Sequence, residues 1–224
     1  MAGYLPVSLR YLWGVPLANG LGSSSTGTDV VASLDLRGTV VIITGAGRGL
    51  GREISRVLYS RGAHVVLTCR SKQQAEAAAS EIRAADAASS AAGKAPIGQI
   101  SPMVCDLASL SSVRNFAEEF KATGLPLHVL INNGAVMSCD FTMSEDGHEL
   151  QFAVNHLAHH LLSNLLLDNL ATTARAARET ERAEPTSGQA RGAVVHLPEG
   201  RIVNITCGMH FFCYRVGGRY GGRA

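Results

Sequence analysis

The chain has 224 residues, of which 46% are hydrophobic and 17% charged, and its formal net charge is +2. This length suits one domain with a sizeable core, and the composition excludes a disordered tail protein, which needs fewer apolar residues and a larger net charge. The near balance of charges gives no general case for nucleic acid as a partner.

The N-terminal stretch is open to two interpretations, because residues 1–28 contain no acidic residue. One is a targeting segment or a segment for peripheral membrane association. The other is a disordered or packed extension, which Pro6, Pro16 and the run Gly20–Gly27 favour because they argue against one long amphipathic helix. No stretch approaches the ~20 apolar residues of a membrane span. We assign residues 1–35 as an N-terminal extension.

From Thr39 onward, expected strands and helices alternate. Thr39–Thr44 is short, apolar and rich in β-branched residues, which predicts a strand buried on both faces. A glycine-rich turn and an amphipathic helix containing Ile54, Val57 and Leu58 come next. The later expected strands are His64–Thr68, Met103–Cys105, Leu127–Ile131 and Arg201–Ile205, and the later expected helices are Lys72–Ala88, Leu110–Phe120 and Glu145–Leu170. This alternation predicts an α/β fold, a doubly wound Rossmann-type parallel sheet.

Two stretches interrupt the alternation. Ala84–Pro96 and Ala171–Gly200 are rich in small or polar residues and are expected to be exposed loops, the second as an insertion before the fifth strand. The domain assignment is therefore an NAD(P)-binding Rossmann domain over residues 36–210, with the insertion at 171–200, and an irregular tail over 211–224.

The turn after the first strand carries the clearest chemical signal. It has the spacing TGxxxGxG and lies between a buried strand and an amphipathic helix. Glycines there permit a tight turn and a close approach of the backbone to a pyrophosphate, which the amides at the start of the next helix bind. The expected cofactor-binding residues of this turn are Thr44, Gly45, Arg48, Gly49, Leu50 and Gly51.

The choice of cofactor is argued from charge. Rossmann sites that use NAD place an acid after the second strand, whereas an arginine there accommodates a 2′-phosphate. Arg70 follows the second strand, and Arg48 lies in the glycine turn. Two guanidinium groups near one point favour NADP over NAD. The alternative is that both arginines face solvent.

Four segments carry a resemblance to a known family: Arg61–Arg70 (RGAHVVLTCR), Cys105–Leu110 (CDLASL), Leu125–Asn133 (LPLHVLINN) and Phe152–His156 (FAVNH). With the glycine turn, they resemble the short-chain dehydrogenase/reductase family from about Ser24 to His210. The resemblance is nearest to the retinol-dehydrogenase-like branch, which includes the WW-domain oxidoreductase and chloroplast-envelope relatives. It implies hydride transfer between NADP(H) and a small lipophilic alcohol or carbonyl, such as a retinoid or polyprenoid, and a homodimer.

The resemblance also implies residue roles. Gly45, Gly49 and Gly51 match the glycines around the cofactor diphosphate. Asp106, followed by Leu107, matches an aspartate that contacts the adenine, although a lone aspartate at this place is otherwise a helix cap. Asn133 matches the second asparagine of the Asn-Asn-Ala-Gly signature, which here has Gly and Ala exchanged. Asn155 matches the asparagine whose backbone holds a water of the proton relay.

The catalytic positions depart from the family pattern. Cys207 stands at the position of the family serine, and a thiol is a weak hydrogen-bond donor. Tyr220 has a plausible offset from Cys207, but the residue four positions later is Ala224, and no lysine follows Lys121. The Tyr-Lys pair of the family is therefore absent. We interpret the chain as an inactive form truncated before the Tyr-x-x-x-Lys motif, and a non-catalytic pseudoenzyme is the alternative.

Histidine and cysteine patterns give no prediction of a metal site. The spacing of His156, His159 and His160 is compatible with metal ligands, but the resemblance implies histidines without metal on this helix. Cys207, His210 and Cys213 have no second ligand pair of suitable spacing. Five scattered cysteines favour a reducing compartment over a disulfide framework. We expect a protein that is not secreted and is cytoplasmic or associated with an organelle membrane.

Overall fold

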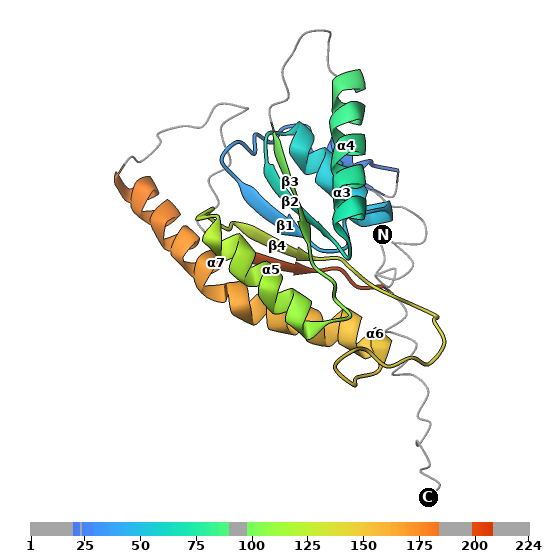
Figure 1. The fold of residues 1–224 in the computed structure, drawn as a ribbon. Helices are drawn as coiled ribbons and strands as arrows, with labels where there is room; N and C mark the ends of the chain where they lie inside the picture. The colour runs from blue at the N-terminus through green and yellow to red at the C-terminus, as the bar shows by residue number, and fades with distance from the viewer. Residues whose placement is uncertain (1–19, 23, 90–97, 184–198, 208–224) are drawn as a thin grey trace, which may run out of the picture.

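The computed structural model describes residues 20–22, 24–89, 98–183 and 199–207. These residues form a parallel sheet of five strands in the order β3-β2-β1-β4-β5 (Figure 1). The strands are β1 (Val40–Ile43), β2 (His64–Cys69), β3 (Gln99–Val104), β4 (Val129–Asn132) and β5 (Arg201–Asn204). The sheet confirms the predicted Rossmann-type fold.

Helices cover both faces of the sheet (Figure 1). One face carries α3 (Gly49–Ser60) and α4 (Lys72–Ser89), and the other carries α5 (Leu110–Ala122) and α7 (Ala158–Ala183). Successive residues of a strand point to opposite faces of the sheet. In β1, Val41 and Ile43 therefore join the core between the sheet and the helices α3 and α4, and Val40 and Ile42 join the core between the sheet and the helices α5 and α7. This two-sided burial explains why the central strands are continuous apolar runs.

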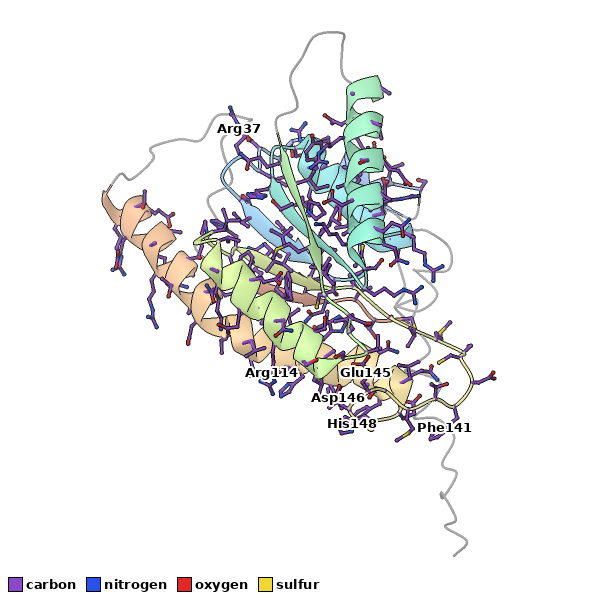
Figure 2. The ribbon with its side chains drawn as sticks, in the orientation of Figure 1. Arg37, Arg114, Phe141, Glu145, Asp146 and His148 are labelled. Atoms are coloured by element: carbon purple, nitrogen blue, oxygen red, sulfur yellow. The ribbon has the colours of Figure 1, made fainter. Side chains whose placement is uncertain are left out.

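The long helix begins later than the sequence predicted. The expected helix from Glu145 is instead a loop followed by α6 (Leu150–Phe152), a π-helical turn η1 (Ala153–Leu157) and then α7. Gly147 has a φ of +76°, which interrupts a helix, and the Glu149 carboxylate accepts hydrogen bonds from the amides of Gln151 and Phe152. In the same loop the Asp146 carboxylate accepts from the Leu110 amide at 2.8 Å and so caps α5 (Figure 2).

Two helices extend into stretches that were expected to be loops. The helix α4 continues to Ser89, and α7 continues to Ala183. Alanine, arginine and glutamate are good helix formers, and the first helix breaker after α7 begins is Pro185. The rest of both expected loops lies outside the described residues.

Part of the expected N-terminal extension packs on the domain. The short helix α2 (Gly27–Val31) has a capping box formed by Thr26 and Asp29, and it lies against α3. Val31 and Leu36 are buried. No helix in the described part of the chain is long and apolar enough to cross a membrane.

Candidate functional site

Residues of the predicted site follow the carboxyl ends of four strands. Thr44 follows β1, Arg70 follows β2, Asp106 follows β3 and Asn133 follows β4. Because the strands are parallel, these ends share one edge of the sheet, where ligands of open α/β folds bind. The fold thus gathers the expected cofactor residues at one edge.

The turn between β1 and α3 offers backbone amides. Gly45 and Gly49 have φ angles of +64° and +57°, a region that glycine adopts without strain. Arg48 is the N-cap of α3 and makes no side-chain cap hydrogen bond. The first N–H groups of α3 therefore remain available at the helix N-terminus, where a diphosphate is stabilised.

Two glycines of the turn have no room for a side chain. A Cβ at Gly45 would lie 2.5 Å from the Cα of Gly134, and a Cβ at Gly51 would lie 2.5 Å from Nδ2 of Asn133 and 2.6 Å from the Gly45 carbonyl oxygen. The first βα turn is therefore packed directly on the segment that follows β4. Leu50, in contrast, has an exposed side chain.

Thr44 and Asn133 join these two segments. The Thr44 hydroxyl accepts hydrogen bonds from the amides of Asn133 at 2.9 Å and Gly134 at 3.0 Å. The Asn133 side-chain amide donates to the carbonyl of Thr44 at 2.9 Å and to that of Gly45 at 3.3 Å. Both side chains hold the turn in shape, so their contribution to a cofactor site is to position its backbone.

The exchanged Gly-Ala pair fits its surroundings. A Cβ at Gly134 would lie 2.5 Å from Cδ1 of Leu107. Leu107 is buried and occupies the space that an alanine methyl at position 134 would need. Glycine at this position is therefore matched to the leucine after β3.

Arg48 and Arg70, on which the choice of cofactor rests, are attached to neighbouring parts of the backbone. A Cβ at Gly47 would lie 3.0 Å from Sγ of Cys69, and these residues directly precede Arg48 and Arg70 in the chain. Both arginines are exposed. Within the described residues neither forms a salt bridge, so both guanidinium groups are available to an anion.

Asp106 has a local role in the structure. Its carboxylate accepts a hydrogen bond from the Ala108 amide at 3.0 Å, and its own amide donates to Oγ of Ser112 at 2.9 Å. Both bonds fix the start of α5. One carboxylate oxygen remains without a bond in this arrangement, which leaves a role at an adenine ring as a proposal.

Asn155 lies in the π-helical turn η1, and its side chain is committed to the backbone of Val136. The Asn155 side chain accepts from the Val136 amide at 2.9 Å and donates to the Val136 carbonyl at 2.8 Å. The π-turn and this double bond fix the loop after β4 against the helix. Cys207 is exposed beyond the end of β5, and Tyr220 lies outside the described residues.

The three neighbouring histidines do not converge. His156 and His160 are exposed and stacked, with ring centroids 6.2 Å apart. His159 is buried, and its Nε2 lies 2.9 Å from the Thr44 hydroxyl. Among the described residues no group of three histidine, cysteine or acidic side chains is placed to hold a metal ion.

The two buried thiols favour their protonated form. Burial raises the pKa of Cys69, and burial together with the nearby Asp106 carboxylate raises the pKa of Cys105 to about 12. A thiolate is the nucleophilic form of cysteine, so burial disfavours the reactive form of both thiols.

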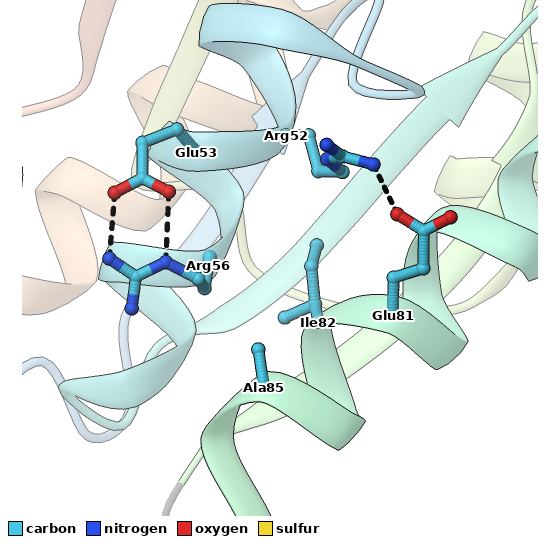
Figure 3. A pocket seen from close by; sticks show the side chains of 6 residues that line it. All are labelled: Arg52, Glu53, Arg56, Glu81, Ile82 and Ala85. Carbon is cyan, nitrogen blue, oxygen red and sulfur yellow. Dashed lines mark hydrogen bonds and ion pairs between the residues drawn. The ribbon is translucent and has the colours of Figure 1, made fainter. Parts of the chain in front are cut away.

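A small pocket lies between α3 and α4 (Figure 3). Its two carboxylates are neutralised by arginines, since Arg52 is ion-paired with Glu81 and Arg56 binds Glu53. The residues that line this pocket include neither Thr44 nor Asn133 nor a glycine of the turn, and its charges are already matched. The glycine turn is the better candidate site.

Sequence analysis missed two residues of the site. Gly134 was noted only as a departure from the family signature, and His159 only as a candidate metal ligand. The role of each residue comes from a contact with Thr44 that joins distant parts of the chain. Gly134 lies 90 positions from Thr44 in the sequence, and His159 lies 115 positions from it. The Gly-Ala exchange itself was the one signal that pointed to position 134.

A sequence model of the family described as short chain dehydrogenase matches residues 39–178. The chain is 40% identical over 199 residues to the short-chain dehydrogenase TIC 32 B, chloroplastic, of Brassica napus, a match that covers 89% of this chain and 53% of that protein. It is 44% identical over 144 residues to retinol dehydrogenase 12 of Homo sapiens, covering 64% of this chain and 43% of that protein. The chain thus spans about half the length of these relatives.

A solved structure has a similar fold. The crystal structure of a metagenomic short-chain oxidoreductase in complex with NADP superposes with a TM-score of 0.51 and 32% identity, covering 62% of this chain and 60% of the other. With the extent of the family match, these similarities confirm the resemblance and the branch drawn from the sequence. The chain belongs to the short-chain dehydrogenase/reductase family, in its retinol-dehydrogenase-like branch.

Proposed function

We propose that this chain is the NADP(H)-binding part of an oxidoreductase that transfers hydride between NADP(H) and a lipophilic alcohol or carbonyl. The observation that carries the proposal is the glycine turn, where unoccupied α3 amides lie beside two exposed arginines, Arg48 and Arg70. A diphosphate fits the amides, and the guanidinium groups suit a 2′-phosphate. Similarity to proteins named retinol dehydrogenase supports a retinoid- or polyprenoid-like substrate.

Different residues of the chain bind different parts of the cofactor in this proposal. The amides of Gly49–Gly51 bind the diphosphate, Arg48 and Arg70 bind the 2′-phosphate, and Asp106 with Leu107 lines the adenine side. Bound NADP(H) supplies the hydride. We assign Asn155 in η1 and Cys207 after β5 to the substrate side, where Cys207 takes the place of the family serine.

A second candidate is a non-catalytic NADP(H)-binding protein, and one observation favours it. Cys207 stands where the family has its serine, and a thiol is a weak hydrogen-bond donor for orienting a substrate oxygen. Both candidates share the cofactor site and differ only in turnover. Peripheral membrane association and a homodimer are further proposals of the same kind.

The test of cofactor binding is calorimetric titration of the 224-residue chain with NADPH and NADH. We expect NADPH to bind about tenfold more tightly or better, because the two guanidinium groups add charge-assisted hydrogen bonds to the phosphate. Arg70→Gln should remove most of this preference and leave NADH affinity unchanged. Arg37→Gln is the matched control, since Arg37 precedes β1 at the opposite edge of the sheet (Figure 2). Equal affinity for both cofactors would refute the NADP assignment.

The test of turnover uses the same chain with retinal, a polyprenal and NADPH, followed by the loss of absorbance of the reduced cofactor. Binding without turnover favours the non-catalytic candidate for this chain. Turnover that survives Arg37→Gln and falls with Arg70→Gln favours the enzyme.

A further inference from the structure

The Thr44 hydroxyl is bonded on every side. Its oxygen accepts the amides of Asn133 at 2.9 Å and Gly134 at 3.0 Å, which uses both lone pairs. Its single proton must therefore be donated outward. The two acceptors within reach are Nε2 of His159 at 2.9 Å and the Ile131 carbonyl at 3.5 Å. The shorter contact identifies His159 as the acceptor.

This requirement fixes the tautomer of His159. A nitrogen that accepts the Thr44 proton carries none of its own, so the ring proton is on Nδ1. Nδ1 lies 3.4 Å from the Asn155 carbonyl oxygen, which can accept it. The two ring contacts thus agree on one arrangement of protons.

We infer that His159 is a positioning residue for the cofactor turn: its neutral imidazole orients the Thr44 hydroxyl so that the turn after β1 stays joined to the segment after β4. The inference rests on the proposed function, because the turn it holds is the proposed diphosphate site. It adds a role for α7 that the cofactor-binding residues alone do not contain.

The consequence of losing the acceptor follows from the packing. Without Nε2, the Thr44 proton turns toward the Ile131 carbonyl, and the lone pairs of the hydroxyl oxygen rotate with it, so they no longer point at both amides. A Cβ at Gly45 would lie 2.5 Å from the Cα of Gly134, so the two segments are in direct backbone contact and a shift of one moves the other. The α3 amides that face a diphosphate are attached to the same turn.

A charged imidazole would break the arrangement in another way. With a proton on Nε2, His159 becomes a donor, and the Thr44 oxygen cannot accept it together with both amides. Burial lowers the pKa of His159, which keeps the ring neutral. Thr44, which meets the ring directly after β1, is uncharged, as are Leu130 and Asn132, the residues of β4 on the α7 face of the sheet. The helix α5 buries only apolar side chains on this face. The hydrogen bond to the Asn155 carbonyl opposes this shift in the pKa of His159, and the charge of His156, the titratable neighbour in η1, adds to it.

The first experiment needs no cofactor. Long-range nitrogen–proton NMR on the full 224-residue chain reports the tautomer, and hydrogen exchange reports protection of the amides of Asn133 and Gly134. We expect an Nδ1–H ring and, in His159→Leu, exchange at these two amides about tenfold faster, while the Leu67 amide in β2 is unchanged. His159→Gln places a carboxamide acceptor where Nε2 lies and should restore protection. An Nε2–H ring, or equal loss of protection at all three amides, overturns the inference.

The second experiment measures NADPH affinity of the same three proteins. We expect about tenfold weaker binding in His159→Leu and a change within about twofold in His159→Gln. As the pH falls below about 6.5 and through the lowered pKa of His159, wild-type affinity should fall more than that of His159→Gln, which does not titrate. Curves that stay parallel down to the pH at which the wild-type chain unfolds overturn the inference, even if the leucine variant fails to fold. If the wild-type chain binds no NADPH, the proposed function fails, and so does the cofactor role of His159. Hydrogen exchange at the amides of Asn133 and Gly134 then still tests whether His159 holds the turn.

Discussion

The strands β1 and β5 lie on either side of β4, and each pairs with it in parallel. All four residues of β1 are buried, whereas all four of β5 are exposed. The middle of β5, Ile202 and Val203, is as apolar and β-branched as β1, so these residues alone do not explain the difference. Helices pack on both faces of β1, whereas β5 is at the edge of the described sheet and its residues are exposed; Gly200, just before it, lies against Leu170 of α7.

The same contrast applies to the segment after each strand. The turn after β1 is held by Thr44, Asn133 and direct backbone contact with Gly134, whereas the residues after β5, through Cys207, are exposed. Within the described residues, the proposed cofactor side of the site is therefore held by several contacts, whereas the proposed substrate side is exposed. If the proposed function is correct, nucleotide binding depends on the first region and turnover on the second, so substitutions should separate the two.

The largest expected effect tests burial directly. Ile42→Ala removes a side chain that is 0% exposed in β1, and Ile202→Ala removes one that is 38% exposed in β5. Urea unfolding should show a loss of about 2–5 kcal/mol in the free energy of unfolding for Ile42→Ala and below about 1 kcal/mol for Ile202→Ala. Equal losses would mean that another segment or molecule packs on β5 in solution. A urea midpoint that rises with protein concentration would identify a second copy of the chain as that partner.

A smaller effect is expected in the glycine turn. Gly51→Ala places a methyl group 2.5 Å from Nδ2 of Asn133 and should cost about 3 kcal/mol of unfolding free energy by overpacking. Gly49→Ala is the control, because its φ is +57° and a Cβ there meets nothing within 4 Å, so only backbone strain of about 1–2 kcal/mol applies. Urea unfolding measures both losses, and NADPH titration should show weaker binding in Gly51→Ala. A Gly49→Ala loss as large as that of Gly51→Ala would contradict the packing argument.

The sequence predicted the first two strands and the turn well because their signals are local. Thr39–Thr44 and His64–Thr68 are continuous runs rich in β-branched residues; β1 is one residue shorter at each end and β2 one residue longer. The third strand was wrong at its start, because β3 begins at Gln99 and not at Met103, and its first half is not a continuous apolar run. The start of the long helix was wrong because Gly147 and the Glu149 cap were not weighed against a helical pattern. The bond of His159 to Thr44 was out of reach, since it joins residues 115 positions apart and depends on the fold.

The smallest expected effect concerns pH and the first residues of β1 and β5. His128, just before β4, bonds to both strands: its Nδ1 accepts from the Val40 amide at 3.0 Å, and its carbonyl accepts from the Arg201 amide at 3.0 Å. Burial lowers the pKa of His128 below its usual value near ~6.5, so the unfolded chain takes up the proton first as the solution is acidified. The stabilisation is complete above that value and is lost as the pH falls through the lower pKa of the folded state.

The bond from the Val40 amide of β1 ends on the titratable Nδ1 of His128, whereas the bond from the Arg201 amide of β5 ends on a backbone carbonyl. Acid should therefore weaken the first bond and leave the second intact. On acidification, hydrogen exchange corrected for intrinsic rates should show falling protection at the Val40 amide and constant protection at the Arg201 amide. His128→Asn keeps an acceptor near the position of Nδ1 without titrating and should flatten the response at Val40. His148→Asn, in an exposed loop, should leave that response unchanged. Parallel loss at both amides would mean that acid separates β5 from β4 as a whole and that the imidazole bond is not the sensitive contact.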